Sequence, residues 1–320
     1  MKGLVAGGGS IGTRHLQNLR ALGVDPLILV EPDIQRRRIL SQDGLVTLMD
    51  TLEEGLAWKP DFAVIASPTQ LHVPQALEAA RRGCHLFIEK PLSYAVDHLD
   101  ELCREIERRG LISMVACNMR YHPGPAMVKR LLGEGEVGEI IAARVQTGSY
   151  LPRWRPYQDY RQSYSASPEW GGVILDCIHE IDLALWYFGP AKVLASVRRP
   201  GRAIDLATDG LAEIILEHEK GVLCSLHLNF IQRDYRRTCQ VIGTEGTLYW
   251  DFEDRDVTVY GPSGERKVTH PEPEGWQMNQ MYLDELRHFL WAVQNDCETV
   301  NSVHKSMAAL EIALVARNMG

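Results

Sequence analysis

Lys90 occupies a position that suggests chemistry, because it lies between an apolar run, His85–Ile88, and Pro91. A lysine between a strand and a proline is fixed in place and can point at whatever lies beyond the end of the strand. Close to another positive charge and partly removed from water, its ammonium group would have a lowered pKa. It could then exchange a proton or polarise a hydroxyl oxygen. The alternative is an ordinary surface lysine at a strand end, which is the commoner case.

A glycine-rich turn at the start of the chain fits the pattern G-x-G-x-x-G. It follows an apolar strand, Gly3–Ala6, and opens a helix, which is the context that a dinucleotide-binding turn requires. The first glycine permits the tight turn, the second lets the backbone approach a pyrophosphate, and the third lets helix and strand pack closely. The N–H groups that begin the helix would hold the phosphates. The candidate cofactor-binding residues of this turn are Gly7, Gly9, Ser10, Ile11 and Gly12.

Glu31 ends the second predicted strand, about 20 residues after the glycines, where an acidic residue accepts hydrogen bonds from the adenosine ribose. A carboxylate there also repels a 2′-phosphate. The alternative is a solvated strand end. Arg36, Arg37 and Arg38 follow, and one of them could reach a 2′-phosphate, but three successive arginines are more typical of a solvated helix face. The sequence therefore favours NAD and leaves NADP open.

The first 120 residues alternate short apolar runs with amphipathic stretches. Strands that are apolar throughout and separated by helices predict a parallel sheet covered on both faces. Thr51 and Glu54 form a capping-box signature that opens one of the helices. We assign residues 1–120 to a Rossmann domain of the α/β class. The predicted strands are Gly3–Ala6, Pro26–Val30, Leu45–Leu48, Phe62–Ala66, His85–Ile88 and Ile112–Ala116.

Polar segments follow four of these strands. Besides the glycine turn they are Ser67-Pro68-Thr69, Glu89-Lys90-Pro91 and Asn118-Met119-Arg120. Because ligands of an open parallel sheet bind beyond the carboxyl ends of its strands, we expect these segments to line one crevice.

After about residue 121 the pattern changes to strands joined by short turns, which is typical of antiparallel sheets. We assign residues 121–320 to a second, α+β domain, with a C-terminal helix that could pack back on the first. One helix, Val173–Phe188, interrupts the strands, and two more close the chain. The predicted strands are Ile140–Ser149, Val193–Arg198, Leu211–Glu217, Val222–Asn229, Arg237–Ile242 and Thr247–Asp251.

Several motifs occur together and in a defined order. In the first half they are the glycine turn, Ser67-Pro68-Thr69 with His72, and Glu89-Lys90-Pro91. They continue with Arg120 and with Gly171-Gly172-Val173-Ile174-Leu175-Asp176, His179 and Asp182. Together they resemble the glucose–fructose oxidoreductase/inositol dehydrogenase family (Gfo/Idh/MocA). The resemblance implies a Rossmann domain, then a domain with a large, mostly antiparallel open sheet. It also implies NAD(P)-dependent chemistry on sugars or inositols, and a homodimer or homotetramer formed through the open sheet.

By this resemblance Lys90 takes the family's catalytic lysine position, and Asp176 and His179 form the substrate-binding and proton-transfer pair. Three residues apart on a helix, these two would share a face, and a histidine oriented by a carboxylate can exchange a hydroxyl proton near neutral pH. Alone, His179 would indicate only a helix histidine packed against the sheet. Many members place the histidine four residues after the aspartate, where this chain has Glu180, so either carboxylate could be its partner. The other candidate cofactor-binding residues are Ser67, Pro68, Thr69, His72, Glu89, Lys90 and Asn118.

A long irregular segment, Tyr150–Tyr164, lies between the first predicted strand of the second domain and the predicted helix Val173–Phe188, which carries Asp176 and His179. Aromatic faces stack on sugar rings and arginines pair with carboxylate or phosphate, so the segment predicts an anionic carbohydrate-type substrate, such as a sugar acid, amino sugar or nucleotide sugar. The alternative is an arm that packs on a neighbouring subunit. The candidate substrate-binding residues are Arg120, Trp154, Arg155, Tyr160, Arg161, Asp176, His179 and Glu180.

The composition of the chain argues against several other classes of protein. The formal net charge of −8 gives no electrostatic reason to expect nucleic acid or an anionic membrane as a partner. No apolar run approaches the roughly 18 residues that span a bilayer. Seven scattered cysteines, never spaced as CxxC, indicate reduced thiols in a cytoplasmic protein and no metal site.

We therefore predict a cytoplasmic NAD(P)-dependent oxidoreductase acting on a CH–OH group of a sugar, sugar acid, inositol or nucleotide sugar. His179 would exchange the hydroxyl proton and Lys90 would polarise the oxygen. One alternative is a redox-neutral NAD-dependent glycosidase, which oxidises its substrate only transiently. Another is a non-catalytic dinucleotide-binding regulator of the same fold, which would need neither Lys90 nor His179.

Overall fold

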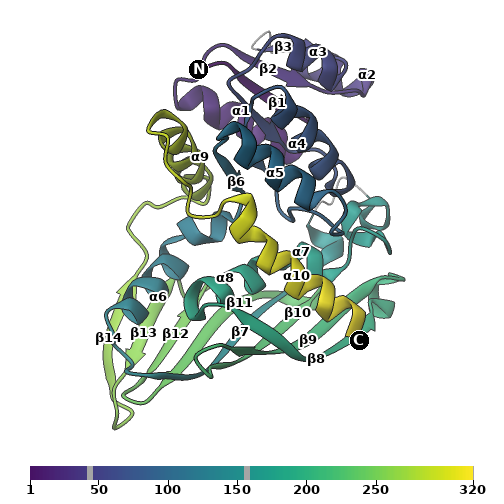
Figure 1. Cartoon of the computed structure of the whole chain (residues 1–320). Coiled ribbons are helices and arrows are strands. Elements are labelled where there is room, and N and C mark those ends of the chain that lie inside the picture. Colours follow the sequence, from purple (N-terminus) through teal and green to yellow (C-terminus); the bar gives the residue numbers. More distant parts are fainter. Residues whose placement is uncertain (42–45, 155–158, 320) are drawn as a thin grey trace. The chain divides into compact units, whose positions relative to one another are not determined.

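The structure is a computed structural model that describes residues 1–41, 46–154 and 159–319 (Figure 1). Its contacts divide the chain into two compact units. The first comprises Met1–Asn118 with Met278–Met307, and the second comprises Met119–Gln277 with Ala308–Gly320. The strand pattern alone assigns Met278–Met307 to the second domain, whereas the contacts assign this segment to the first unit.

The first unit contains a six-stranded parallel sheet in the order β3-β2-β1-β4-β5-β6. This confirms the predicted Rossmann-type domain. Its strands are β1 (Gly3–Ala6), β2 (Leu27–Val30), β3 (Thr47–Met49), β4 (Phe62–Ile65), β5 (His85–Ile88) and β6 (Ser113–Val115). Its helices are α1 (Ser10–Ala21), α2 (Ile34–Leu40), α3 (Leu52–Ala57), η2 (Thr69–Leu71), α4 (His72–Arg81), α5 (Leu99–Arg109), α9 (Asn279–Gln294) and the start of α10 (Val303–Met319). Leu45, where the third strand was predicted to begin, lies outside the described residues.

The core of this unit explains why α9 belongs to it. β1, β2 and β4 are buried at every position, as expected for parallel strands covered on both faces. The ring of Phe289, on α9, packs edge-on against Phe62 and Phe87, with centroids 5.7 and 5.5 Å apart. On the same helix Asn279 exchanges hydrogen bonds with Asn18 of α1.

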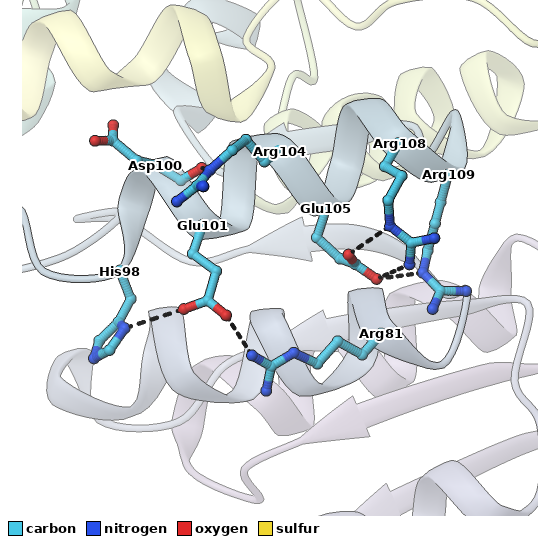
Figure 2. A network of polar contacts seen from close by, with 8 residues as sticks. All are labelled: Arg81, His98, Asp100, Glu101, Arg104, Glu105, Arg108 and Arg109. Atoms are coloured by element: carbon cyan, nitrogen blue, oxygen red, sulfur yellow. Dashed lines mark hydrogen bonds and ion pairs between the residues drawn. The ribbon is translucent and has the colours of Figure 1, made fainter.

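The outward face of α5 carries charged side chains rather than a site. Figure 2 shows Glu105 accepting hydrogen bonds from Arg108 and Arg109, and Glu101 accepting one from Arg81 of α4. The hydrogen bonds from Arg108 and Arg109 lower the pKa of Glu105 to about 2. Exposed pairs of this kind are screened by water and add little stability.

The second unit contains an eight-stranded sheet in the order β14-β13-β12-β11-β7-β10-β9-β8. Only the β7–β10 pair is parallel, which confirms the predicted, mostly antiparallel sheet. Its strands are β7 (Ile140–Tyr150), β8 (Ala191–Pro200), β9 (Asp209–His218), β10 (Leu223–Asn229), β11 (Ile231–Gly243), β12 (Thr247–Asp251), β13 (Asp256–Tyr260) and β14 (Arg266–Pro271). Its helices are η3 (Asn118–Tyr121), α6 (Pro123–Gly133), η4 (Leu151–Arg153), η5 (Tyr160–Gln162), η6 (Tyr164–Ala166), α7 (Val173–Asp176), α8 (Ile178–Phe188) and η7 (Arg202–Ile204).

The two faces of this sheet differ. α6 and α8 pack on one face, where Ala143, Val145 and other alternate residues are buried (Figure 1). The opposite face exposes large apolar side chains, among them Val197, Ile215 and Leu223. Alternation of this kind marks one face as core, and leaves on the other exposed apolar side chains that another protein surface could cover.

The helix predicted over Val173–Phe188 is two helices. α7 ends at Asp176 and α8 begins at Ile178, because Cys177 between them leaves the helical region with ψ at 31°. Asp176 and His179 therefore lie on different helices, which corrects the expectation that they share one helix face.

Candidate active site

The glycine turn has the shape that a dinucleotide requires. Gly7 has φ of +103°, and a Cβ on Gly12 would lie 1.8 Å from the carbonyl oxygen of Gly7. A Cβ on Gly9, in contrast, would meet nothing closer than an Arg36 nitrogen 4.0 Å away. Gly9 caps α1 without a side-chain hydrogen bond, so the first N–H groups of the helix, from Ser10 onward, receive no side-chain cap. An open backbone and uncapped N–H groups fit a pyrophosphate.

Replacing Gly12 by alanine is expected to weaken NADH binding by roughly tenfold or more, because the new Cβ must displace the carbonyl of Gly7. Fluorescence titration with NADH measures the effect. Gly133→Ala is the matched control, since a Cβ there meets no atom within 4 Å, and its NADH affinity should equal that of the unchanged protein. Equal affinity in the Gly12 variant would remove this turn from the cofactor site.

Glu31 is buried and supports the glycine turn from the end of β2. Its two carboxylate oxygens accept hydrogen bonds from the N–H groups of Gly8, at 2.8 Å, and Asp33, at 2.9 Å. The Nη1 atom of Arg36 lies 3.6 Å from one of these oxygens. Arg37 donates to the carbonyl oxygen of Glu31 and pairs with an aspartate on the surface. Arg36 is therefore the arginine of the three that lies against both Glu31 and the glycine turn.

The segment that carries Lys90 is held by its neighbours. The backbone N–H of Lys90 donates to Glu89 Oε2 at 3.1 Å. The ring of His72 lies between two backbone carbonyl oxygens, with Nδ1 2.8 Å from Pro91 and Nε2 2.9 Å from Ser67. Burial lowers the pKa of His72, so a neutral ring donates to one of the two carbonyls. His72 thus joins the ends of β4 and β5 through backbone contacts.

The predicted cofactor segments lie at one edge of the first sheet. β1, β4, β5 and β6 are neighbours and parallel, so the glycine turn, Ser67-Pro68-Thr69, Glu89-Lys90-Pro91 and Asn118 follow their carboxyl ends in spatial order.

In the second unit Asp176 is held by the segment that precedes it. The hydroxyl groups of Tyr164 and Ser165 donate to its two carboxylate oxygens, the latter at 2.7 Å. Both residues belong to η6, which begins at Tyr164, the last residue of the long irregular segment. Part of that segment therefore packs against the predicted substrate-binding aspartate within the same chain.

His179, at the start of α8, is largely buried. The next residue, Glu180, has no exposed surface, and its carboxylate accepts a hydrogen bond from Arg237 Nε of β11 at 2.6 Å. Burial works against the charge of Arg237, but the Glu180 carboxylate overcomes it and raises the pKa of Arg237 above its ordinary value. Arg237 thus holds one oxygen of Glu180, while the two hydroxyl groups of η6 hold both oxygens of Asp176. Both carboxylates therefore remain candidate partners for His179.

Two of the arginines predicted to bind substrate are paired with carboxylates. Arg120 forms a bidentate pair with Asp182, through Nε at 2.8 Å and Nη2 at 2.6 Å. Arg161 binds Asp159 at 3.0 Å and approaches Asp205 at 3.5 Å. Arg155 lies outside the described residues.

The predicted aromatic residues are also engaged. Trp154 is 43% exposed, and its indole N–H donates to the hydroxyl of Ser149. The hydroxyl of Tyr160 donates to the carbonyl oxygen of Ile204 at 2.8 Å. The exposed face of Trp154 therefore remains the better candidate for stacking on a ring.

Other features of the chain do not point to a second kind of site. A hollow of about 620 Å³ over β11–β14 and one of about 290 Å³ between α6 and β13–β14 contain none of the predicted residues. Within residues 1–41, 46–154 and 159–319, no three His, Cys, Asp or Glu side chains are grouped to hold a metal ion. Nor does this part of the chain contain a helix long and apolar enough to cross a membrane.

A parallel sheet with this turn after β1, and a braced lysine after β5, define a Rossmann-type NAD-binding oxidoreductase. Residues 1–117 match the family described as "Oxidoreductase family, NAD-binding Rossmann fold", and residues 126–249 match "GFO/IDH/MocA C-terminal domain". The chain belongs to the Gfo/Idh/MocA family of oxidoreductases. The predicted family, fold class, cofactor and enzyme class are thereby confirmed.

Similar proteins cover nearly the whole chain. An uncharacterized oxidoreductase, YrbE, of Bacillus subtilis is 26% identical over 98% of this chain and 92% of its own length. The scyllo-inositol 2-dehydrogenase (NAD(+)) of the same organism is 24% identical over 81% of this chain and 75% of its own. The structure of levoglucosan dehydrogenase with NADH and levoglucosan has a TM-score of 0.87 at 20% identity, covering 100% of this chain and 98% of the other, which shows the shared fold.

Proposed function

We propose that this chain transfers a hydride between NAD and a carbinol carbon of a small carbohydrate-type substrate, a sugar or an inositol. The observation that carries the proposal is the placement of Lys90. It follows β5 at the same sheet edge as the glycine turn, on a segment held by Glu89 and His72. Several relatives are named for inositols, sugars or sugar derivatives, which supports this substrate class, although one is named for 4-carboxy-2-hydroxymuconate-6-semialdehyde.

When bound, NAD supplies the hydride acceptor or donor. Lys90 polarises the substrate oxygen through its ammonium group, and His179 exchanges the hydroxyl proton. Asp176, held in place by Tyr164 and Ser165, orients a second substrate hydroxyl. The proposed cofactor-binding residues are Gly7, Gly9, Ser10, Ile11, Gly12, Glu31, Ser67, Pro68, Thr69, Glu89, Lys90 and Asn118, and His72 acts by bracing them.

A neutral substrate fits the described residues better than an anionic one. Arg120 and Arg161 were the described arginines expected to bind a carboxylate or phosphate, and both are already paired with aspartates. The Arg120–Asp182 pair is buried, so freeing its guanidinium for an anion is costly, whereas the exposed Arg161 pair is weak and carries no such argument. We therefore place neutral sugars and inositols ahead of sugar acids and nucleotide sugars.

The test compares matched substrates that differ by one carboxylate. With NAD and either glucose or glucuronate, followed by the near-ultraviolet absorbance of NADH, we expect kcat/KM to favour the neutral sugar by about tenfold or more. myo-Inositol and levoglucosan extend the neutral set. A preference for glucuronate would restore the anionic substrate. Release of an aglycone from a glycoside without net NADH would instead support the redox-neutral glycosidase, and tight NADH binding without any turnover would support the regulator.

We also propose a homodimer or homotetramer formed through the second sheet and a cytoplasmic location. The open sheet face that carries Val197, Ile215 and Leu223 supports the homodimer or homotetramer, since exposed apolar side chains on a sheet face favour contact with another subunit. All seven cysteines are free and six are buried, which supports a reducing compartment.

A further inference from the structure

His15 lies on α1, three residues after Gly12, and is completely buried. Its Nε2 atom is 2.6 Å from Glu89 Oε1, and its ring packs edge-on against Phe87, with centroids 5.2 Å apart. A side chain with no exposed surface cannot touch the cofactor or the substrate. Any effect that it has on the reaction must pass through the residues around it.

The surroundings of His15 settle which nitrogen carries the proton. Among the described residues Nδ1 has no hydrogen-bond partner. A proton on that atom would be buried without an acceptor, which is costly. The proton therefore sits on Nε2, and His15 donates it in a hydrogen bond to Glu89.

Glu89 contacts both His15 and Lys90. Its second oxygen, Oε2, accepts the backbone N–H of Lys90 at 3.1 Å, and its side chain is only 11% exposed. One carboxylate thus joins the helix that follows the glycine turn to the residue that polarises the substrate oxygen. All three residues belong to the first unit.

We propose that His15 is a positioning residue for Lys90, which acts through the carboxylate of Glu89 and fixes the Lys90 segment to the dinucleotide-binding helix. The inference rests on the role proposed above for Lys90. Its physical basis is that reacting groups must be held to within fractions of an ångström by packed neighbours and hydrogen bonds. Without the donor, Glu89 would rotate toward water and release the N–H of Lys90.

The test observes Lys90 directly, so it does not depend on knowing the substrate. The holoprotein is acetylated with a trace of acetic anhydride at several pH values, and mass spectrometry measures the rate and apparent pKa at Lys90. In His15→Leu we expect the rate to change by about threefold or more, with the NADH dissociation constant unchanged within about twofold. His15→Gln, which keeps a donor, should restore most of the original rate.

Asn18→Leu is the control for a merely structural role. Asn18 is buried on the same helix and hydrogen-bonded to Asn279, remote in sequence from the Lys90 segment. Asn18→Leu should lower thermal stability, as His15→Leu does, but it should leave the acetylation rate of Lys90 unchanged. Equal changes at Lys90 in both variants would overturn the proposal.

A double-mutant cycle tests whether the effect passes through Glu89. If it does, His15→Leu combined with Glu89→Gln changes Lys90 reactivity no more than the stronger single change, whereas independent effects multiply. Multiplying effects, or an unchanged Lys90 in His15→Leu, contradict the inference. A wrong function for Lys90 would be recognised separately. Turnover would then survive Lys90→Ala, whether or not His15→Leu changes the acetylation of Lys90.

Discussion

Replacing Lys90 by alanine is expected to lower kcat by about 10²–10⁴-fold, the range that a positioned proton-exchanging or polarising group contributes. NADH affinity should stay within about twofold, because the phosphates are expected to bind the glycine turn and the start of α1 rather than Lys90. Steady-state kinetics with a substrate from the panel, and fluorescence titration with NADH, measure the two quantities.

Two further substitutions define what Lys90 does. Lys90→Arg keeps the positive charge, but a guanidinium cannot release its proton near neutral pH. Partial recovery of kcat would indicate that charge alone polarises the oxygen, and no recovery would indicate proton exchange. Lys2→Ala removes a lysine that precedes β1 and therefore lies at the opposite end of the sheet, and it should leave kcat unchanged. An unaltered kcat in Lys90→Ala would contradict the proposed mechanism.

The first unit could be predicted largely from the sequence because its signals are local. Most strands of its sheet are short apolar runs, and the glycine pattern, the polar strand ends and the capping box at Thr51 and Glu54 each lie within a few residues. The sequence analysis allowed a C-terminal helix to pack back on the first domain, but nothing in the sequence singled out α9. Phe289 reaches Phe62 and Phe87 from far along the chain, and nothing in its neighbourhood indicates which domain it joins.

The second sheet was predicted less completely because some of its strands are not apolar runs. β14 begins with two charged residues and is exposed or half-buried along its whole length at the sheet edge. β13, although Val257 and Val259 alternate in it, is only five residues long and follows a stretch of acidic residues. β11 begins at Ile231, before a register shift that ends at Arg236, so its exposed first half carries no apolar pattern. Pairing with neighbours, rather than local pattern, makes these segments strands.

The substrate side of the site shows the same limit. The sequence motifs identified Lys90, Asp176 and His179 as candidates. They did not identify the side chains that hold these residues in place. Arg237 has no sequence signal, since its partner Glu180 is 57 residues away. His15 is 74 residues from Glu89. Tyr164 could only be counted among the tyrosines of the irregular segment. Long-range polar partners depend on the folded geometry, which spacing along the chain does not encode.

Replacing Arg237 by methionine is expected to lower the free energy of unfolding by about 3–5 kcal/mol, the cost of leaving a buried carboxylate without its partner. Glu180 has no exposed surface, and among the described residues Arg237 holds its Oε1 atom while its Oε2 atom has no hydrogen-bond partner. Guanidinium unfolding followed by tryptophan fluorescence measures the change. Arg81→Met is the control, because the pair of Arg81 with Glu101 is exposed and should add no measurable stability.

The double variant Arg237→Met with Glu180→Leu removes both charges. It therefore separates the net contribution of the ion pair to the free energy of unfolding from the cost of leaving one charge buried alone. Apolar side chains of similar size often replace a buried ion pair without loss, so stability should return to within about 1 kcal/mol of the original. Recovery of stability with reduced turnover would show that the pair serves the placement of His179, the residue before Glu180 on α8. Recovery of both stability and turnover would show that the Arg237–Glu180 pair has a structural role only. A double variant as unstable as Arg237→Met would mean that the destabilisation comes from lost packing around Arg237 and not from a stranded charge.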